Sequence, residues 1–203
     1  QLSRMVTDHN GYLFTDAVQT VGHYALDLSK LPITGLAASA HKFHGPKGVG
    51  FLYAKKGTKL HRIYGGGEQE KGLRPGTENM TAIAGMAMAM KMCYVDLEEA
   101  QSRMASLKNQ LQESLISLIP RITFNGNPSS SNSILSASFP PHDENEMLQF
   151  NLDLNGVAVS AGSACASGAL KDSHVMEALN HDKDRAVIRF SLSRFTSKED
   201  IDT

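Results

Sequence analysis

Two residues of opposite charge follow short apolar runs near the start of the chain. Asp16 follows the run 12–15, and Lys42 comes shortly after the run 35–39. In α/β folds, side chains at the carboxyl ends of neighbouring strands reach the same cleft. There an amine can attack a carbonyl group, and a carboxylate can keep a ring nitrogen protonated. Taken alone, Lys42 is better explained as a solvated turn lysine and Asp16 as a helix N-cap, so other residues must decide.

A cysteine in the second half of the chain lies among unusually small neighbours. The residues flanking Cys165, from 162 to 168, are glycine, serine and alanine. Such a loop packs weakly and moves easily, as a thiol that visits two partners must. The alternative is a buried structural cysteine, which this polar context disfavours. Cys93 is the opposite case, because it lies in a methionine-rich apolar stretch and is expected in the core.

Other candidate sites are weak. The histidines show no metal-ligand spacing, so we expect no metal. The run 65–67 is all glycine, but it lacks the Lys-Ser/Thr ending of a nucleotide-binding loop. We interpret it as a flexible approach to the segment that follows.

The elements that would position these residues alternate along the chain. The runs 12–15, 35–39 and 49–54 are typical of strands covered on both faces of a sheet. Methionine and leucine then recur every three or four residues over 78–119, which predicts one long helix bridging two domains, 1–98 and 99–203.

The second half repeats the alternation of strands and helices. Strands are expected at 121–124, 133–139, 157–159 and 186–192, and helices at 144–154 and 173–179. Thr196 and Glu199 have capping-box spacing, which predicts a last helix there. The fold class is therefore α/β.

Composition narrows the class of protein. The 203 residues are 41% hydrophobic and 20% charged, with 20 basic and 21 acidic side chains, typical of a globular protein. No basic stripe suits nucleic acid, and no apolar run suits a membrane. Two cysteines form no disulfide framework, so we expect a reducing, cytoplasmic location. The chain opens on glutamine, and we expect a fragment of a longer protein.

Five stretches in order carry a family resemblance. Together they resemble the cysteine desulfurases, which are class V aminotransferases of the pyridoxal phosphate fold type I. The stretches are 16–19, 39–48, 72–79, 160–165 and 188–192. The resemblance implies part of a large domain with a mixed, mostly parallel sheet over 1–98, and a small α/β carboxyl-terminal domain over 99–203. The chain would be the carboxyl-terminal half of such an enzyme.

The resemblance implies a role for each matching residue near the cofactor ring. Lys42 would hold pyridoxal 5′-phosphate as a Schiff base and move protons. Asp16 would pair with the pyridinium nitrogen, and Gln19 would bond the ring oxygen.

The remaining matches imply phosphate and substrate contacts. Ser39 and His41 would bind the phosphate, and Thr77 would reach the phosphate of the other subunit in a homodimer. Arg189 would hold the substrate carboxylate. Cys165 would take the sulfur of L-cysteine as a persulfide and release alanine. The family's ring-stacking histidine and part of its phosphate cup belong to the other half, so we expect an incomplete site here.

Three functions stay open at this point. The first is a cysteine desulfurase passing sulfur to an acceptor such as an iron–sulfur scaffold protein or a transfer-RNA thiolation pathway. The second is a selenocysteine lyase, which differs in the substrate atom. The third is a non-catalytic fragment that serves as a dimerisation or sulfur-relay module.

Overall fold

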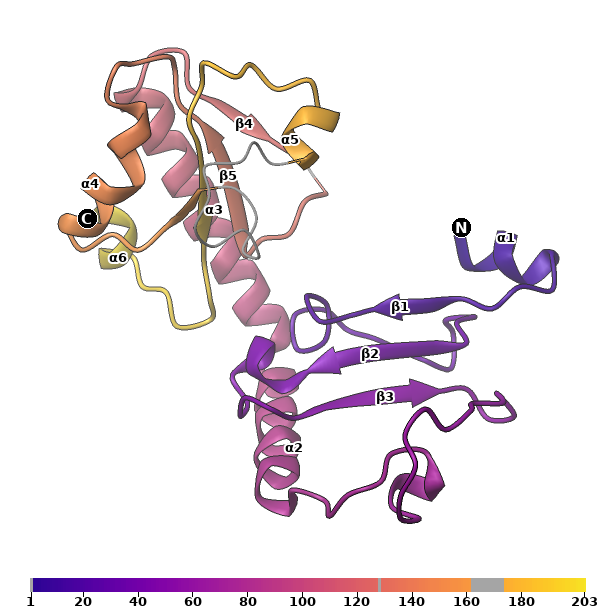
Figure 1. The fold of residues 1–203 in the computed structure, drawn as a ribbon. Helices are drawn as coiled ribbons and strands as arrows, with labels where there is room; N and C mark the ends of the chain where they lie inside the picture. The colour runs from indigo at the N-terminus through magenta and orange to yellow at the C-terminus, as the bar shows by residue number, and fades with distance from the viewer. Residues whose placement is uncertain (1, 128, 162–173) are drawn as a thin grey trace. The chain divides into compact units, whose positions relative to one another are not determined.

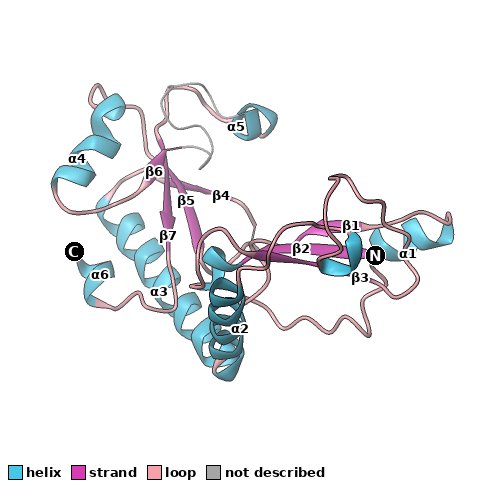
Figure 2. Cartoon of the chain, turned by 60° about the horizontal axis from the view of Figure 1, so that its bottom comes forward, coloured by secondary structure: helices cyan, strands magenta, loops and turns pink. Residues whose placement is uncertain are grey.

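The chain is described in a computed structural model that covers residues 2–127, 129–161 and 174–203 (Figure 1). Its contacts divide it into two compact units, 1–97 and 98–203. Each combines helices with a β-sheet (Figure 2). The α/β class expected from the alternating runs is confirmed.

The first unit is built on a three-stranded sheet with the order β1–β2–β3. β1 (Phe14–Asp16) runs parallel to β2 (Gly35–Ser39), and β2 runs antiparallel to β3 (Gly50–Ala54). Its helices are α1 (Leu2–Asp8), the short 3-10 turns η1 (Ala40–Phe43) and η2 (Glu70–Gly72), and α2 (Met80–Val95).

One face of this sheet forms the core of the first unit. Along β2, Leu36 and Ala38 are buried whereas Ala37 between them is exposed, as strand alternation requires. Both side chains belong to a core cluster to which residues of β3 and α2 contribute; they are Phe51, Tyr53, Met86, Ala89, Met90 and Cys93. The opposite face carries the exposed side chains of Phe14 and Leu52. Coverage of both faces was expected, and the described residues cover one.

The second unit contains a four-stranded sheet whose pairings are all antiparallel, in the order β4–β5–β7–β6. The strands are β4 (Thr123–Asn125), β5 (Ile134–Ser138), β6 (Ser160–Ala161) and β7 (Val187–Ser191). The helices are α3 (Leu97–Leu118), η3 (Asn145–Met147), α4 (Leu148–Leu154), α5 (His174–Ala178) and α6 (Glu199–Asp202). Leu135, Ala137 and Ile188 on β5 and β7 are buried, as are Met104 and Leu107 on α3.

The prediction of one continuous helix over 78–119 is wrong. The structure ends α2 at Val95 and begins α3 at Leu97, with Asp96 between them outside helical geometry (φ −128°, ψ 33°). Aspartate favours the position before a helix, and Glu98 and Glu99 in the first turn of α3 suit its positive dipole end. Asp96 with Glu99 has capping-box spacing, a signal that the apolar periodicity obscured.

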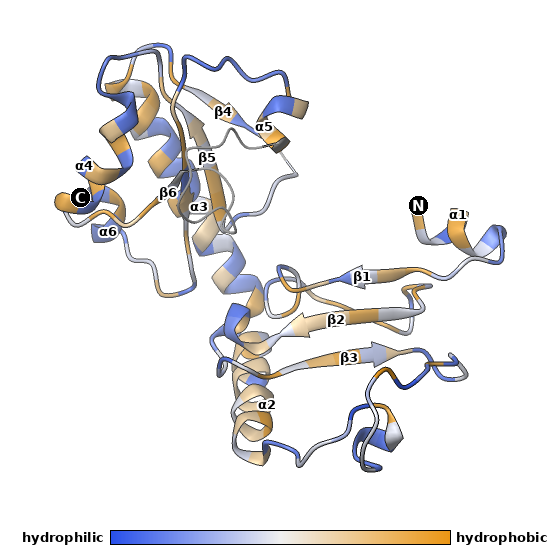
Figure 3. Cartoon of the chain, in the orientation of Figure 1, coloured by the Kyte–Doolittle hydropathy of each residue, from blue (hydrophilic) through white to orange (hydrophobic). Residues whose placement is uncertain are grey.

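Figure 3 shows α2 largely in apolar colours. Its 16 residues include one charged side chain, Lys91. Within the described part of the chain, no single helix is long and apolar enough to cross a membrane. The consecutive pair α2 and α3 passes such a test together, by length and composition only.

Candidate functional site

The carboxyl edge of the parallel strand pair brings three of the expected site residues into one region. Asp16 is the last residue of β1, and Ser39 is the last of β2. The two strands run in the same direction with Asp16 opposite Ala37, so both end at the same edge of the sheet. Lys42 follows Ser39 within η1. The topology therefore places Asp16, Ser39 and Lys42 where α/β sheets bind ligands.

The turn that carries Lys42 is tied to its surroundings through the backbone. The Ala40 N–H donates to the carbonyl of Val49 at 3.0 Å, and the Gly45 N–H closes the turn onto the carbonyl of Ala40 at 2.9 Å. The ring nitrogen Nε2 of His23 lies 3.0 Å from the carbonyl oxygen of Lys42, so that histidine donates to it from the segment after β1. The backbone around Lys42 is thus held by a hydrogen bond to its own carbonyl and by those of neighbouring residues in the turn.

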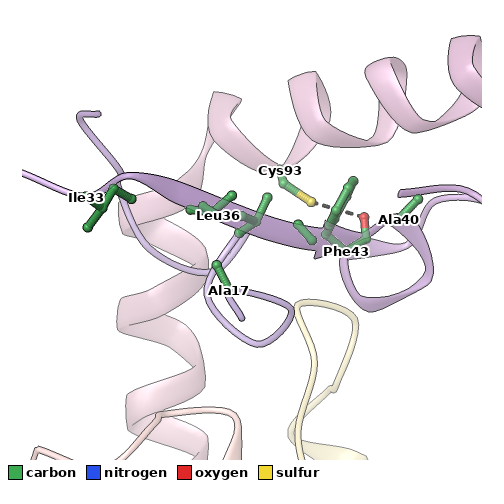
Figure 4. Packing of buried hydrophobic residues seen from close by; sticks show 8 residues of the cluster. Ala17, Ile33, Leu36, Ala40, Phe43 and Cys93 are labelled. Carbon is green, nitrogen blue, oxygen red and sulfur yellow. Dashed lines mark hydrogen bonds between the residues drawn. The ribbon is translucent and has the colours of Figure 1, made fainter. Parts of the chain in front are cut away.

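Burial of Phe43 anchors the same turn in the core (Figure 4). Phe43 is fully buried, and the Cys93 thiol on α2 donates to its carbonyl oxygen at 3.4 Å. Cys93 is itself 3% exposed, which confirms its expected place in the core. Gly22 passes so close that a Cβ there would lie 2.5 Å from the Cβ of Phe43. The Lys42 side chain, half-buried, thus extends from a rigid base.

The polar residues around this edge differ in whether their side chains already make hydrogen bonds within the protein. Asp16 is exposed and accepts the Val18 N–H on its Oδ1 at 2.9 Å. It therefore caps a turn rather than the helix that was the alternative interpretation, because no helix begins in the described residues between β1 and β2. Ser39 precedes η1 in extended geometry, and its side chain makes no capping hydrogen bond. His41 and Gln19 are exposed. Each of these residues is at least partly exposed.

Thr77 lies in the long loop between β3 and α2. Its side chain is exposed. Two residues further on, the Asn79 carboxamide accepts the Ala82 N–H at 3.1 Å and caps α2. The expected role of Thr77 in a second subunit stays a prediction.

In the second unit, Arg189 occupies the middle of β7, opposite Ser136 of β5 on one side and Ser160 of β6 on the other. Its guanidinium Nε is buried and has no hydrogen-bond partner among the residues the structure describes. A buried donor without a partner costs free energy. Arg189 is therefore held in the sheet with an Nε–H that no described residue accepts.

Cys165 lies outside the described residues. Its expected role as sulfur acceptor stays a prediction from the sequence.

Two contacts of the first unit are not predicted by any local sequence pattern. His23 lies 19 residues before Lys42, and only the fold brings its ring to that peptide. Arg62 donates to backbone oxygens of the loop that leads to Thr77. Both are single residues in unremarkable stretches, and neither belongs to a motif.

The comparisons with known proteins agree with this arrangement. The family model for class-V aminotransferases matches residues 1–203. The chain belongs to the class-V aminotransferase family. Enzymes of this family depend on pyridoxal 5′-phosphate, so the expected fold family and cofactor are confirmed at that level.

Several members of the class-V family resemble the chain throughout. It is 40% identical to the cysteine desulfurase IscS of Dictyoglomus turgidum over 204 residues, which cover 99% of the chain and 52% of that relative. It is 35% identical to the cysteine desulfurase NifS of Azotobacter vinelandii, over 100% of the chain and 51% of the relative. The chain spans about half the length of these relatives.

Solved structures show the same fold. A NifS-like protein superimposes with a TM-score of 0.87 at 35% identity, covering 99% of this chain and 53% of that one. The cysteine desulfurase CsdA of Escherichia coli superimposes with a TM-score of 0.82 at 23% identity, a likeness of fold alone.

The residues at the carboxyl edge of β1 and β2 fit the family's cofactor by their chemistry. Lys42 supplies an amine for an aldehyde, and Ser39 supplies a hydroxyl that its own turn does not use. Asp16 keeps Oδ2 for a protonated ring nitrogen, because its Oδ1 accepts the Val18 N–H.

Proposed function

We propose that the protein containing this chain is a cysteine desulfurase that uses pyridoxal 5′-phosphate to move sulfur from L-cysteine to Cys165. The observation that carries the proposal is the convergence of Asp16, Ser39 and Lys42 at one edge of the sheet. The likeness to desulfurases over the whole chain supports it.

Within this proposal, each residue acts through a group it already presents. The bound cofactor would supply an electron sink for reactions at the amino acid it carries. Lys42 would bind the cofactor with its amine and move protons at the substrate. Asp16 Oδ2 would hold the ring nitrogen protonated, and Gln19 would bond the ring oxygen.

The phosphate and the substrate would be held by hydrogen-bond donors. Ser39 and His41 would bind the phosphate together with Thr77 of the second subunit in a homodimer. Arg189 would bind the substrate carboxylate through its guanidinium.

The sulfur step balances without an added oxidant. The Cys165 thiolate attacks the sulfur of the bound cysteine, so that a sulfur–sulfur bond forms as the substrate's carbon–sulfur bond breaks. The electron pair of that bond stays on carbon, which takes up a proton, and alanine leaves. The persulfide then passes its outer sulfur to an acceptor protein, for which an iron–sulfur scaffold in the cytoplasm is the expected class.

The test is borohydride reduction of the natural protein after incubation with pyridoxal phosphate, followed by mass analysis of the peptide containing Lys42. The proposal expects the cofactor's mass on that lysine and its loss in Lys42→Ala. Cys165→Ala should keep the cofactor and stop sulfur release. Failure to trap the cofactor on Lys42 in the unaltered protein contradicts the enzyme and favours a relay fragment. Faster turnover of selenocysteine than of cysteine would favour a lyase.

A further inference from the structure

The loop between β3 and α2 is organised around one side chain, Arg62. Its Nε donates to the carbonyl of Gly72, its Nη1 to that of Gly66 at 3.2 Å and its Nη2 to that of Gly67 at 3.0 Å. The same Nη2 contacts Glu68 Oε1 at 3.1 Å. Hydrogen bonds from a charged guanidinium are stronger than neutral ones. A single residue therefore fastens both ends of the segment 66–72.

This loop needs an external fastening because its backbone is unfavourable. Glu70 and Lys71 have φ values of 49° and 58°, in the left-handed region that side chains rarely adopt. Gly66 and Gly72 are also at positive φ, and a Cβ on Gly66 would lie 2.6 Å from Pro75. Conformations of this kind persist only where surrounding contacts determine them. The carbonyl contacts of Arg62 are such contacts.

The fastened segment is joined directly to Thr77. The Gln69 side-chain oxygen accepts the N–H of Gly76, the residue before Thr77, at 3.2 Å. On the other side, the Asn79 carboxamide binds the Ala82 N–H at the start of α2. Thr77 thus lies between two fixed points, one of which depends on Arg62. Glu68 adds little, because its side chain is 88% exposed and an exposed ion pair is weak.

We propose that Arg62 is a positioning residue for the cofactor's phosphate, acting through the loop that presents Thr77. The inference rests on the proposed function, because it takes Thr77 to be a phosphate ligand. Arg62 does not touch the phosphate itself. Its guanidinium holds the loop in place before the cofactor binds, so that less conformational entropy is lost when the Thr77 hydroxyl contacts the phosphate.

The test measures the dissociation constant for pyridoxal phosphate in the natural protein. Arg62→Met, which removes the donors, should raise that constant about tenfold or more, the range for losing a hydrogen bond to a charged group. Arg62→Lys should raise it nearly as much, because one ammonium cannot replace a planar fork with several donors. Arg103→Met, on an exposed position of α3, is the matched control and should change it less than about twofold.

A double-mutant cycle separates positioning from general stability. If Arg62 acts through Thr77, Arg62→Met combined with Thr77→Ala should weaken cofactor binding no more than Thr77→Ala alone. The absorbance maximum of the bound cofactor should stay unchanged, because Lys42 is not altered. If Arg62→Met does not fold, Arg62→Lys takes its place in the cycle.

Two results overturn the inference alone, with the cofactor still trapped on Lys42. One is an unchanged dissociation constant in Arg62→Met. The other is a double variant whose loss equals the product of the two single losses. If the unaltered protein traps no cofactor on Lys42, the proposed function and the phosphate role of Arg62 fall together.

Discussion

The ring nitrogen of His23 lies 3.0 Å from the carbonyl oxygen of Lys42. The contact joins the segment after β1 to the turn after β2. It therefore links the chain beyond the carboxyl ends of the two parallel strands. Because it acts on the backbone of Lys42, it restrains where the side chain begins and leaves the amine available.

His23→Ala should therefore loosen the Lys42 turn. We expect a loss of about 1 kcal/mol in the free energy of unfolding, the usual net value of one hydrogen bond. Amide exchange at Lys42 and Phe43 should become faster. His9→Ala is a matched control, because the His9 ring also contacts a carbonyl, that of Met5, at 2.8 Å on an exposed helix. Equal exchange at Lys42 in both variants would contradict the tether.

A comparison of alanine variants at Gly22 and Gly48 measures the packing of Gly22 against Phe43 separately from backbone strain. Both have φ of +79°, but a Cβ on Gly22 would lie 2.5 Å from Phe43, whereas nothing lies within 4 Å of one on Gly48. Gly48→Ala should cost about 1–2 kcal/mol, the cost of a left-handed side chain. Gly22→Ala should cost about 1–3 kcal/mol more, from overpacking. Urea unfolding of both variants measures the difference, and equal losses would rule out the packing contribution.

Arg189 and Arg185 share a buried Nε without a described partner but differ in their other contacts. Nη2 of Arg185 donates to the carbonyls of Arg121 at 2.6 Å and Ser138 at 2.7 Å. Arg185→Met should lower the free energy of unfolding by about 1–3 kcal/mol, because two carbonyls lose a charged donor. Arg189→Met removes an Nε donor that no described residue accepts, so stability should stay equal or rise.

The same pair separates binding from stability. If Arg189 holds the substrate carboxylate, Arg189→Met should raise KM for cysteine about tenfold or more. Arg185→Met should leave KM within about twofold of the unaltered value wherever the protein stays folded. Denaturant unfolding and steady-state kinetics measure the two effects. A destabilised Arg189→Met with an unchanged KM would show a structural role instead.

Much of the carboxyl edge of β1 and β2 was predictable because its determinants are local. The run 35–39 is a strand with the bounds expected, and the run around Phe51 differs by one residue at its start. Asp16 ends β1 and Lys42 comes shortly after β2, as their positions indicated. The expected strand 157–159 is displaced, since the structure places β6 at Ser160–Ala161.

The contacts that sequence could not provide are those made across the fold. His23 and Lys42 are 19 residues apart, and Cys93 reaches the Phe43 carbonyl from 50 residues away. Apolar spacing reports which face of a helix is buried, but not which peptide a polar side chain meets. For the same reason, nothing in the stretch around Arg62 marked it as the centre of a loop.

The last helix shows how a local signal can be assigned one residue too early. Thr196 and Glu199 have capping-box spacing, yet the reciprocal pair in the structure is Ser197 and Asp200. The Ser197 N–H donates to Asp200 Oδ2 at 2.8 Å, and the Asp200 N–H donates to Ser197 Oγ at 3.2 Å. Thr196 instead accepts the Ser193 N–H with its hydroxyl at 2.9 Å. Both pairs have suitable residue types, so spacing alone did not choose between them.

The Ser197–Asp200 pair makes the stability of α6 depend on pH. The backbone N–H of Ser197, and then its hydroxyl, hold the pKa of the Asp200 carboxyl below its ordinary value. A carboxyl with a lowered folded-state pKa stabilises above the unfolded pKa of about 3.9 and loses this effect as pH falls through the lowered value. We therefore expect α6 to fray below about pH 4, as measured by amide exchange or chemical shifts at Ile201 and Asp202.

Two variants test the cause of this acid fraying. Asp200→Asn should remove the pH dependence of α6, because the side chain no longer titrates. Ser197→Ala should move the pKa of Asp200 part of the way back to its ordinary value, since the backbone N–H of residue 197 remains. Asp27 is the internal control, because Ser29 and Lys30 lower its pKa and neither is changed. An Asp200 pKa that is unchanged in Ser197→Ala would show that the hydroxyl contributes nothing.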